Sequence, residues 1–142
     1  MSRLFVYLVV AIFCITKTLA QSESFYFIQL SDPQFGMLEK NKSFSQETMI
    51  MEKVIAAINN LNPAFVVITG DMVNDGKDQK QIDEFKRVCK LIKKSIPVYV
   101  LPGNHDLSQQ CTDESISNYM DEYGYDCFSF QVNNSCFIGL NT

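Results

Sequence analysis

The sequence lacks the features that mark several common classes of binding protein. It contains no Gly-x-Gly-x-x-Gly and no phosphate loop ending in Lys-Ser or Lys-Thr, which argues against a nucleotide-binding α/β domain. Lysine and arginine number 12 against 16 acidic residues and form no basic patch, so we expect no nucleic-acid partner. The chain has no repeats or low-complexity tracts, and it contains only one histidine, His105. These absences favour one modest domain whose histidine chemistry is limited to a single residue.

The first twenty residues have the pattern of a targeting segment. Arg3 supplies a positive start, residues 4–15 are an unbroken apolar stretch, and the Thr-Leu-Ala at 18–20 offers small residues at the usual cleavage spacing. We therefore predict a signal peptide over residues 1–20. A membrane anchor is the alternative, but the apolar stretch is short for a bilayer. The prediction places the protein in the secretory pathway or outside the cell, with no stable membrane insertion after cleavage.

Cleavage would leave an acidic chain with an even number of cysteines. Residues 21–142 retain ten basic and sixteen acidic residues, a net charge of −6. Cys89, Cys111, Cys127 and Cys136 remain, which suits an oxidising compartment and allows three pairings. All four being reduced is the other possibility, and none has the spacing of a zinc finger.

Residues 25–101 alternate between the patterns of strands and helices. Five segments carry this alternation: strand 25–30, helix 46–61, strand 64–69, a helix between 78 and 96, and strand 97–101. Ser43 and Gln46 are spaced as a capping box for the first helix, and Asp78 is the expected cap of the second. Right-handed crossovers would make the three strands parallel. The fold class is therefore predicted to be α/β.

The remaining residues predict one more helix and a hairpin. The helix is expected at 113–123, and strands at 127–132 and 135–140 would be joined at Asn133-Asn134. The last of these strands would leave an unpaired edge, so we expect a domain over residues 21–142 that is truncated on its carboxyl-terminal side.

Three short motifs follow the three predicted strands, each where an apolar run ends. The motifs are Ser31-Asp32-Pro33-Gln34, Gly70-Asp71-Met72-Val73-Asn74 and Gly103-Asn104-His105-Asp106. Each motif taken singly has a structural alternative, because Asp before Pro and Gly-Asp after a strand are common in turns. Together, the three motifs follow neighbouring strands of an α/β sheet in sequence order. This arrangement indicates a site that gathers metal ligands.

The residue types fit a pair of cations that assist phosphoester hydrolysis. Asp71 is the candidate for a carboxylate that bridges two ions, Asp32 would bind one ion, and Asn104 would bind the other through its amide oxygen. His105 would donate a hydrogen bond or a proton to the substrate. Asp106 would either orient His105 or fix the loop.

At these residues the chain resembles the calcineurin-like metallophosphoesterase family. Gly70-Asp71 and Gly103-Asn104-His105-Asp106 match two of its motifs, and Asp32 matches the first position of another. Gln34 stands where that first motif normally has histidine. Asp-Pro-Gln followed by Phe35-Gly36 is similar to the branch of calcineurin-like phosphoesterase domain-containing proteins. The resemblance covers residues 25–142.

The resemblance implies a four-layer α/β/β/α sandwich, of which this chain would form the amino-terminal half. It also implies a site of two iron, manganese or zinc ions at the strand ends, where a metal-bound hydroxide attacks a phosphoprotein or small phosphate ester. The matching positions for metal ligands are Asp32, Gln34, Asp71 and Asn104. These are few ligands for two ions, so we expect little activity from the chain alone. A secreted, catalytically inactive binding protein of the same fold is the alternative.

Overall fold

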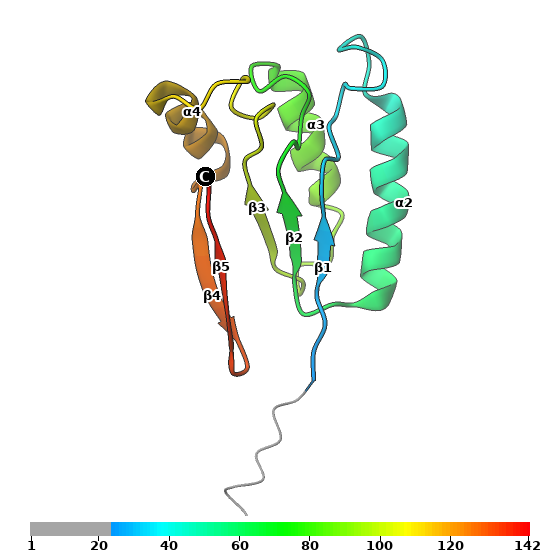
Figure 1. Cartoon of the computed structure of the whole chain (residues 1–142). Coiled ribbons are helices and arrows are strands. Elements are labelled where there is room, and N and C mark those ends of the chain that lie inside the picture. Colours follow the sequence, from blue (N-terminus) through cyan, green and yellow to red (C-terminus); the bar gives the residue numbers. More distant parts are fainter. Residues whose placement is uncertain (1–23) are drawn as a thin grey trace, which may run out of the picture.

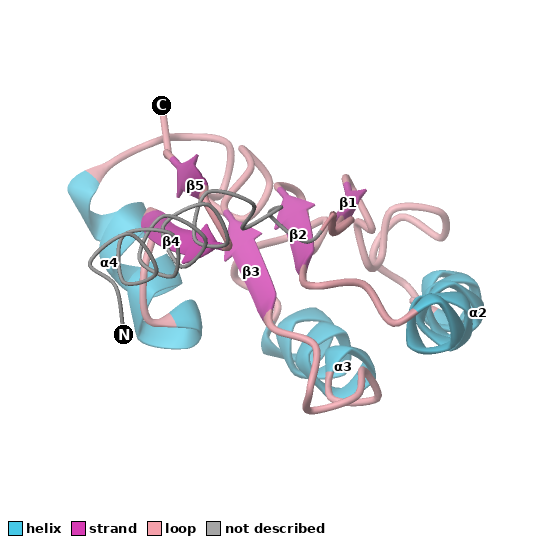
Figure 2. Cartoon of the chain, turned by 90° about the horizontal axis from the view of Figure 1, so that it is seen from below, coloured by secondary structure: helices cyan, strands magenta, loops and turns pink. Residues whose placement is uncertain are grey.

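A computed structural model describes residues 24–142, and three parallel strands form its centre. Strands β1 (Ile28–Leu30), β2 (Val66–Thr69) and β3 (Val98–Leu101) lie in the order β1-β2-β3 and point the same way in Figure 1. Helices α2 (Ser45–Leu61) and α3 (Gln79–Cys89) make the crossovers and cover one face of the sheet (Figure 2). The predicted alternation of strand and helix is confirmed. The predicted signal peptide lies outside the described residues.

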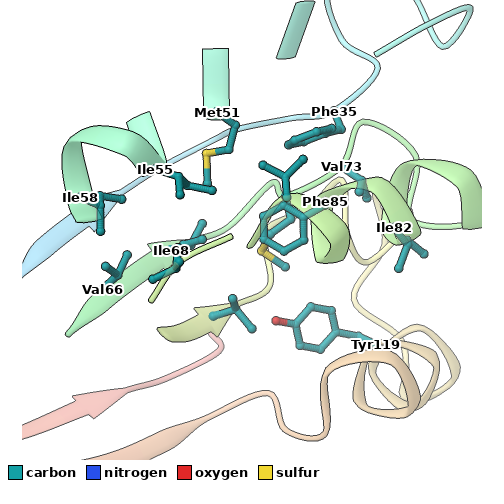
Figure 3. Packing of buried hydrophobic residues seen from close by; sticks show 14 of the residues in the cluster. Phe35, Met51, Ile55, Ile58, Val66, Ile68, Val73, Ile82, Phe85 and Tyr119 are labelled. Carbon is teal, nitrogen blue, oxygen red and sulfur yellow. The ribbon is translucent and has the colours of Figure 1, made fainter. Parts of the chain in front are cut away.

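The core lies between the sheet and these two helices. Val66 and Ile68 of β2 are fully buried because alternate side chains of a strand point to the same face. Figure 3 shows Met51, Ile55 and Ile58 of α2 close to them, at the helical spacing that places three side chains on one stripe. This packing fixes the sheet beneath the loops that carry the three motifs.

The helix ends confirm one predicted cap and correct another. Asp78 caps α3, since its carboxylate accepts a hydrogen bond from the backbone N–H of Lys80 at 3.0 Å. The predicted capping box of α2 is wrong, because the N-cap is Phe44 and no side chain caps it. Ser43 precedes that position and accepts from Ser45 N, while the amide of Gln46 donates to Glu39. The predicted spacing was one residue out of step with the helix start.

A hairpin covers the other face of the sheet at the β3 side. Strands β4 (Phe128–Val132) and β5 (Ser135–Gly139) pair antiparallel as predicted. Their aromatic rings contact the sheet: Phe130 stacks on Tyr99 with ring centroids 3.9 Å apart, and Phe137 lies 4.8 Å from Phe65. The described residues therefore supply one helical layer and two strand layers. This arrangement confirms the α/β class and agrees with part of the predicted sandwich.

Helix α4 (Asp113–Tyr123), also predicted, connects β3 to the hairpin and closes one end of the core (Figure 1). Its Tyr119 is 3% exposed and contacts the core cluster. Within residues 24–142, no helix is long and apolar enough to cross a membrane.

The four described cysteines are all free. Cys136 lies opposite Gln131 in the hairpin, whereas Cys127 precedes the far end of the same ladder, so these two residues are not neighbours. Cys89 lies on α3, where burial raises the pKa of its thiol to about 12. Of the possibilities left open by the sequence, the structure has the reduced form.

Candidate functional site

The three motifs lie side by side at the carboxyl edge of the sheet, at the upper ends of β1, β2 and β3 in Figure 1. Backbone hydrogen bonds continue the sheet ladder into the loops: Asp32 N donates to Gly70 O at 3.2 Å, and Gln34 N donates to Asp71 O at 2.9 Å. Gly70 N in turn donates to Leu101 O at 3.0 Å. The prediction that all three motifs share one edge is confirmed.

The second and third motifs are in direct contact. The backbone N–H of His105 donates to Asp71 Oδ1 at 3.0 Å. A Cβ atom on Gly103 would lie 2.2 Å from that same oxygen and 2.5 Å from Asp71 N, so only glycine allows this approach. Gly70 has a φ of +83°, which favours glycine, and a Cβ atom on it would lie 3.1 Å from Gly103 Cα. The two glycines of the motifs are thus required by the packing of one loop against the other.

Three of the four candidate metal ligands have left-handed backbone conformations. The φ angles are +53° for Asp32, +41° for Gln34 and +47° for Asp71. Such conformations are unfavourable for residues with a side chain, by about 1–3 kcal/mol each, and they occur often at functional sites. The ladder bonds between the loops hold the strained backbone in place. Three of the nine described non-glycine residues with positive φ are therefore candidate ligands.

The side chains at this edge suit a cation. Asp71 Oδ1 accepts the His105 N–H, and an oxygen of Asp32 accepts from Ser31 Oγ, but neither carboxylate is paired with lysine or arginine. In the described part of the chain the ion pairs involve residues of the helices α2, α3 and α4 instead. Two neighbouring acidic loops without a basic partner fit positive charge from a bound ion.

Only two of the four candidate ligands are acidic. Accordingly, residues 24–142 contain no group of three or more His, Cys, Asp or Glu that could hold a metal. Gln34 and Asn104 add carboxamide oxygens, which are hard ligands without charge. By residue type these four ligands suit a cation. Asp32 and Gln34 line a hollow beside α2, whereas Asn104 lines a different hollow beside Asn141.

The imidazole of His105 is held by a backbone carbonyl. Its Nδ1 lies 2.7 Å from Asn74 O, and because a carbonyl only accepts, Nδ1 carries the proton. Nε2 is then the ring atom left for a ligand. The ring borders a polar pocket of about 320 Å³ that Lys77 and Gln109 also line. Its setting suits contact with a polar molecule bound in this pocket.

Asp106 contacts the loops instead of the imidazole. Its carboxylate is 7% exposed and accepts three backbone N–H groups, from Met72 and Val73 at 3.2 Å each and from Gly103 at 2.8 Å. Burial raises the pKa of this carboxyl to about 6, and the three N–H donors oppose that shift. Of the two roles expected from the sequence, these contacts match the fixing of the loop. A direct catalytic role of Asp106 stays a prediction.

Gln81 is a buried residue that the sequence reasoning missed. It is 1% exposed, its Oε1 accepts the N–H groups of Asn74 and Asp75 at 3.0 Å, and its Nε2 donates to Asn41 and Asp78. The signal was present, because a glutamine four residues before Phe85 falls on the apolar stripe of α3. Gln81 thus supports the loop whose carbonyl holds His105.

A family model described as calcineurin-like phosphoesterase matches residues 25–141 of this chain. The chain belongs to that family. The calcineurin-like phosphoesterase fold is also found by comparison with solved structures. A dimetal phosphatase from Danio rerio superimposes with a TM-score of 0.56 at 15% identity, over 79% of this chain and 42% of that one.

Named relatives of the chain include enzymes of two kinds. The rat serine/threonine-protein phosphatase CPPED1 is 34% identical over 133 residues, which are 83% of this chain and 43% of the relative. The human protein of that name is 34% identical and is covered to 42%. A probable glycerophosphodiester phosphodiesterase GpdQ from Arcobacter nitrofigilis is 32% identical over 75% of this chain and 36% of its own length. The chain thus spans less than half the length of these relatives.

Proposed function

We propose that the domain to which this chain contributes is a metal-dependent phosphoester hydrolase. The observation that carries the proposal is the pair of loops bearing Asp32 and Asp71, hydrogen-bonded to each other and without a basic partner, next to Asn104 and His105. Acidic oxygens in this arrangement would otherwise repel a phosphate, so an anionic substrate requires bound cations here. The proposal includes two ions, of iron, manganese or zinc.

The residues of this chain would have separate tasks in hydrolysis. Asp71 and Asp32 offer carboxylate oxygens to the ions, and Asn104 and Gln34 offer carboxamide oxygens. Bound metal would neutralise the phosphate and activate water near neutral pH. His105, with Nδ1 fixed by Asn74, presents Nε2, from which a protonated ring could give a proton to the leaving oxygen.

The substrates we propose are a phosphoprotein or a small phosphate ester. Relatives at a similar level of identity are named as serine/threonine phosphatases and as a probable phosphodiesterase. The polar pocket beside His105 suits a hydrophilic leaving group, since it is lined by amide, hydroxyl and charged side chains. Because the relatives are named as enzymes, we favour hydrolysis over the alternative of an inactive binding protein. The secreted location stays a prediction.

The test is hydrolysis of an aryl phosphate by the longest natural chain that contains these residues. We expect chelation to stop the reaction, Mn²⁺ or Zn²⁺ to restore it, and Asp71→Ala to abolish it. Asp83→Ala is the matched control, because Asp83 is an exposed residue of α3 and should leave the rate unchanged.

Two outcomes would contradict the proposal. Hydrolysis that survives both chelation and Asp71→Ala would place the chemistry elsewhere in the protein. Thermal stabilisation by metal without any hydrolysis would support the inactive binding protein instead.

A further inference from the structure

The segment after the third motif returns to Asn104 and contacts it twice. Ser108 and Gln109 have left-handed backbones, with φ angles of +57° and +66°. This curl brings Gln109 N to 2.6 Å from Asn104 O, and it brings Gln109 Oε1 to 2.7 Å from Asn104 Nδ2. One residue therefore holds both the main chain and the side chain of Asn104.

In the side-chain contact Asn104 donates through Nδ2 and Gln109 accepts, which leaves the oxygen of the Asn104 carboxamide free. An amide offers a cation only its oxygen, and rotation by half a turn would present the NH₂ group instead. Because Nδ2 of Asn104 donates to Gln109, the oxygen is held on the opposite branch of the amide. Within residues 24–142 this oxygen forms no hydrogen bond, so it remains available to an ion.

The returning segment is itself anchored to the core. Leu107, just before the curl, is 4% exposed and belongs to the core cluster, and Ser108 N donates to His105 O at 3.1 Å. Gln109 is exposed and borders both the pocket beside His105 and a second hollow beside Asn104. A fixed backbone thus carries a side chain that reaches Asn104 and borders the pocket beside His105.

We propose that Gln109 is a positioning residue that holds the Asn104 carboxamide with its oxygen toward a bound divalent cation. The inference rests on the proposed function, in which Asn104 is a metal ligand. Partners that orient metal ligands contribute about 10-fold to 100-fold to metal affinity. The contact of Gln109 is a single neutral hydrogen bond at an exposed site, so the lower figure applies.

The experiment measures the affinity of the longest natural chain that contains these residues for Mn²⁺, by calorimetric titration without any substrate. We expect Gln109→Ala to weaken binding about 10-fold. Gln109→Glu keeps an acceptor oxygen for Asn104 Nδ2 and should bind at least as tightly as wild type. Gln110→Ala changes the exposed neighbour and should leave the affinity unchanged. Urea unfolding of the metal-free variants shows whether Gln109→Ala acts through stability, which we expect to be unchanged.

A double-mutant cycle tests the route of the effect. If Gln109 acts through Asn104, Gln109→Ala has no further effect on Mn²⁺ affinity in an Asn104→Ala chain. The proposal is overturned if Gln109→Ala leaves the affinity unchanged, or if it lowers affinity equally in both backgrounds. A wild-type chain that binds no Mn²⁺ would instead refute the proposed metal site and the positioning role together, which distinguishes the two failures.

Discussion

The buried carboxylate of Asp106 ties the second motif to the third, and replacing it should loosen both loops. Oδ1 accepts from Val73 N, while Oδ2 accepts from Met72 N and Gly103 N. Asp106→Asn keeps the size of the side chain but leaves only one acceptor oxygen. At least one of the three N–H donors must then face the NH₂ group, so it loses its partner in a buried position.

The expected loss of stability follows from that unpaired donor. A buried group left without its hydrogen bond costs about 1–3 kcal/mol, and bonds to a charged acceptor are worth about 1.5–3 kcal/mol each. Burial of the charged carboxylate also has a cost, because burial raises its pKa to about 6. The neutral asparagine avoids this cost, which offsets part of the loss. With these opposing effects we expect Asp106→Asn to lower the free energy of unfolding by about 2 kcal/mol. A domain of this size is stable by only about 5–15 kcal/mol, so the change is measurable.

Urea unfolding of the metal-free chain, followed by circular dichroism, measures this loss. Asp83→Asn is the control, since Asp83 is exposed on α3 and accepts one hydrogen bond from Gln79, and its effect should stay within about 0.5 kcal/mol. If Asp106→Asn unfolds at the same urea concentration as wild type, the carboxylate does not hold the loops. Unchanged stability together with lost hydrolysis in the longest natural chain would instead support the catalytic role.

Two matched pairs of substitutions and one labelling result follow from the packing of the chain. Gly103→Ala should destabilise by at least about 2 kcal/mol, because its Cβ would clash with backbone, whereas Gly124→Ala meets no atom within 4 Å and should cost about 1 kcal/mol of backbone strain. Gln81→Met should cost about 2–4 kcal/mol through two unpaired N–H groups, while exposed Gln46→Met stays within about 0.5 kcal/mol. Thermal unfolding compares each pair, and equal effects within a pair would contradict the argument. Cys89, with its pKa raised to about 12, should resist alkylation at pH 8 while the exposed cysteines react, as peptide mass spectrometry would show.

Much of the fold was predictable because its signals are local. Apolar runs of strand length alternate with helical stripes, and Asp78 before α3 is a cap that acts within its own turn. The predicted capping box failed because Ser43 accepts from Ser45 N and the Gln46 amide donates to Glu39, so neither side chain makes a capping-box bond. The hairpin was predicted from its strands, but its contact with the sheet rests on aromatic rings that are distant in sequence.

The site was predictable in its residues but not in their contacts. Parallel strands bring their carboxyl ends to one edge, so Asp32, Asp71 and Asn104 could be grouped from the order of elements alone. No sequence pattern indicates that Gln109 curls back to Asn104, because that contact needs two successive left-handed residues. Gln81 could have been found as a polar residue on a buried stripe.

The sequence by itself determined the order of strands and helices, the parallel sheet and the place of each motif after its strand, since hydrophobic spacing and turn residues act over a few positions. Only the tertiary structure decided which atoms are left for a cation or a proton. Asp106 could have faced the imidazole or the backbone, and its place was set by N–H groups more than thirty residues away along the chain. Hydrogen bonds between distant loops have no period in the sequence, so packing alone selects them.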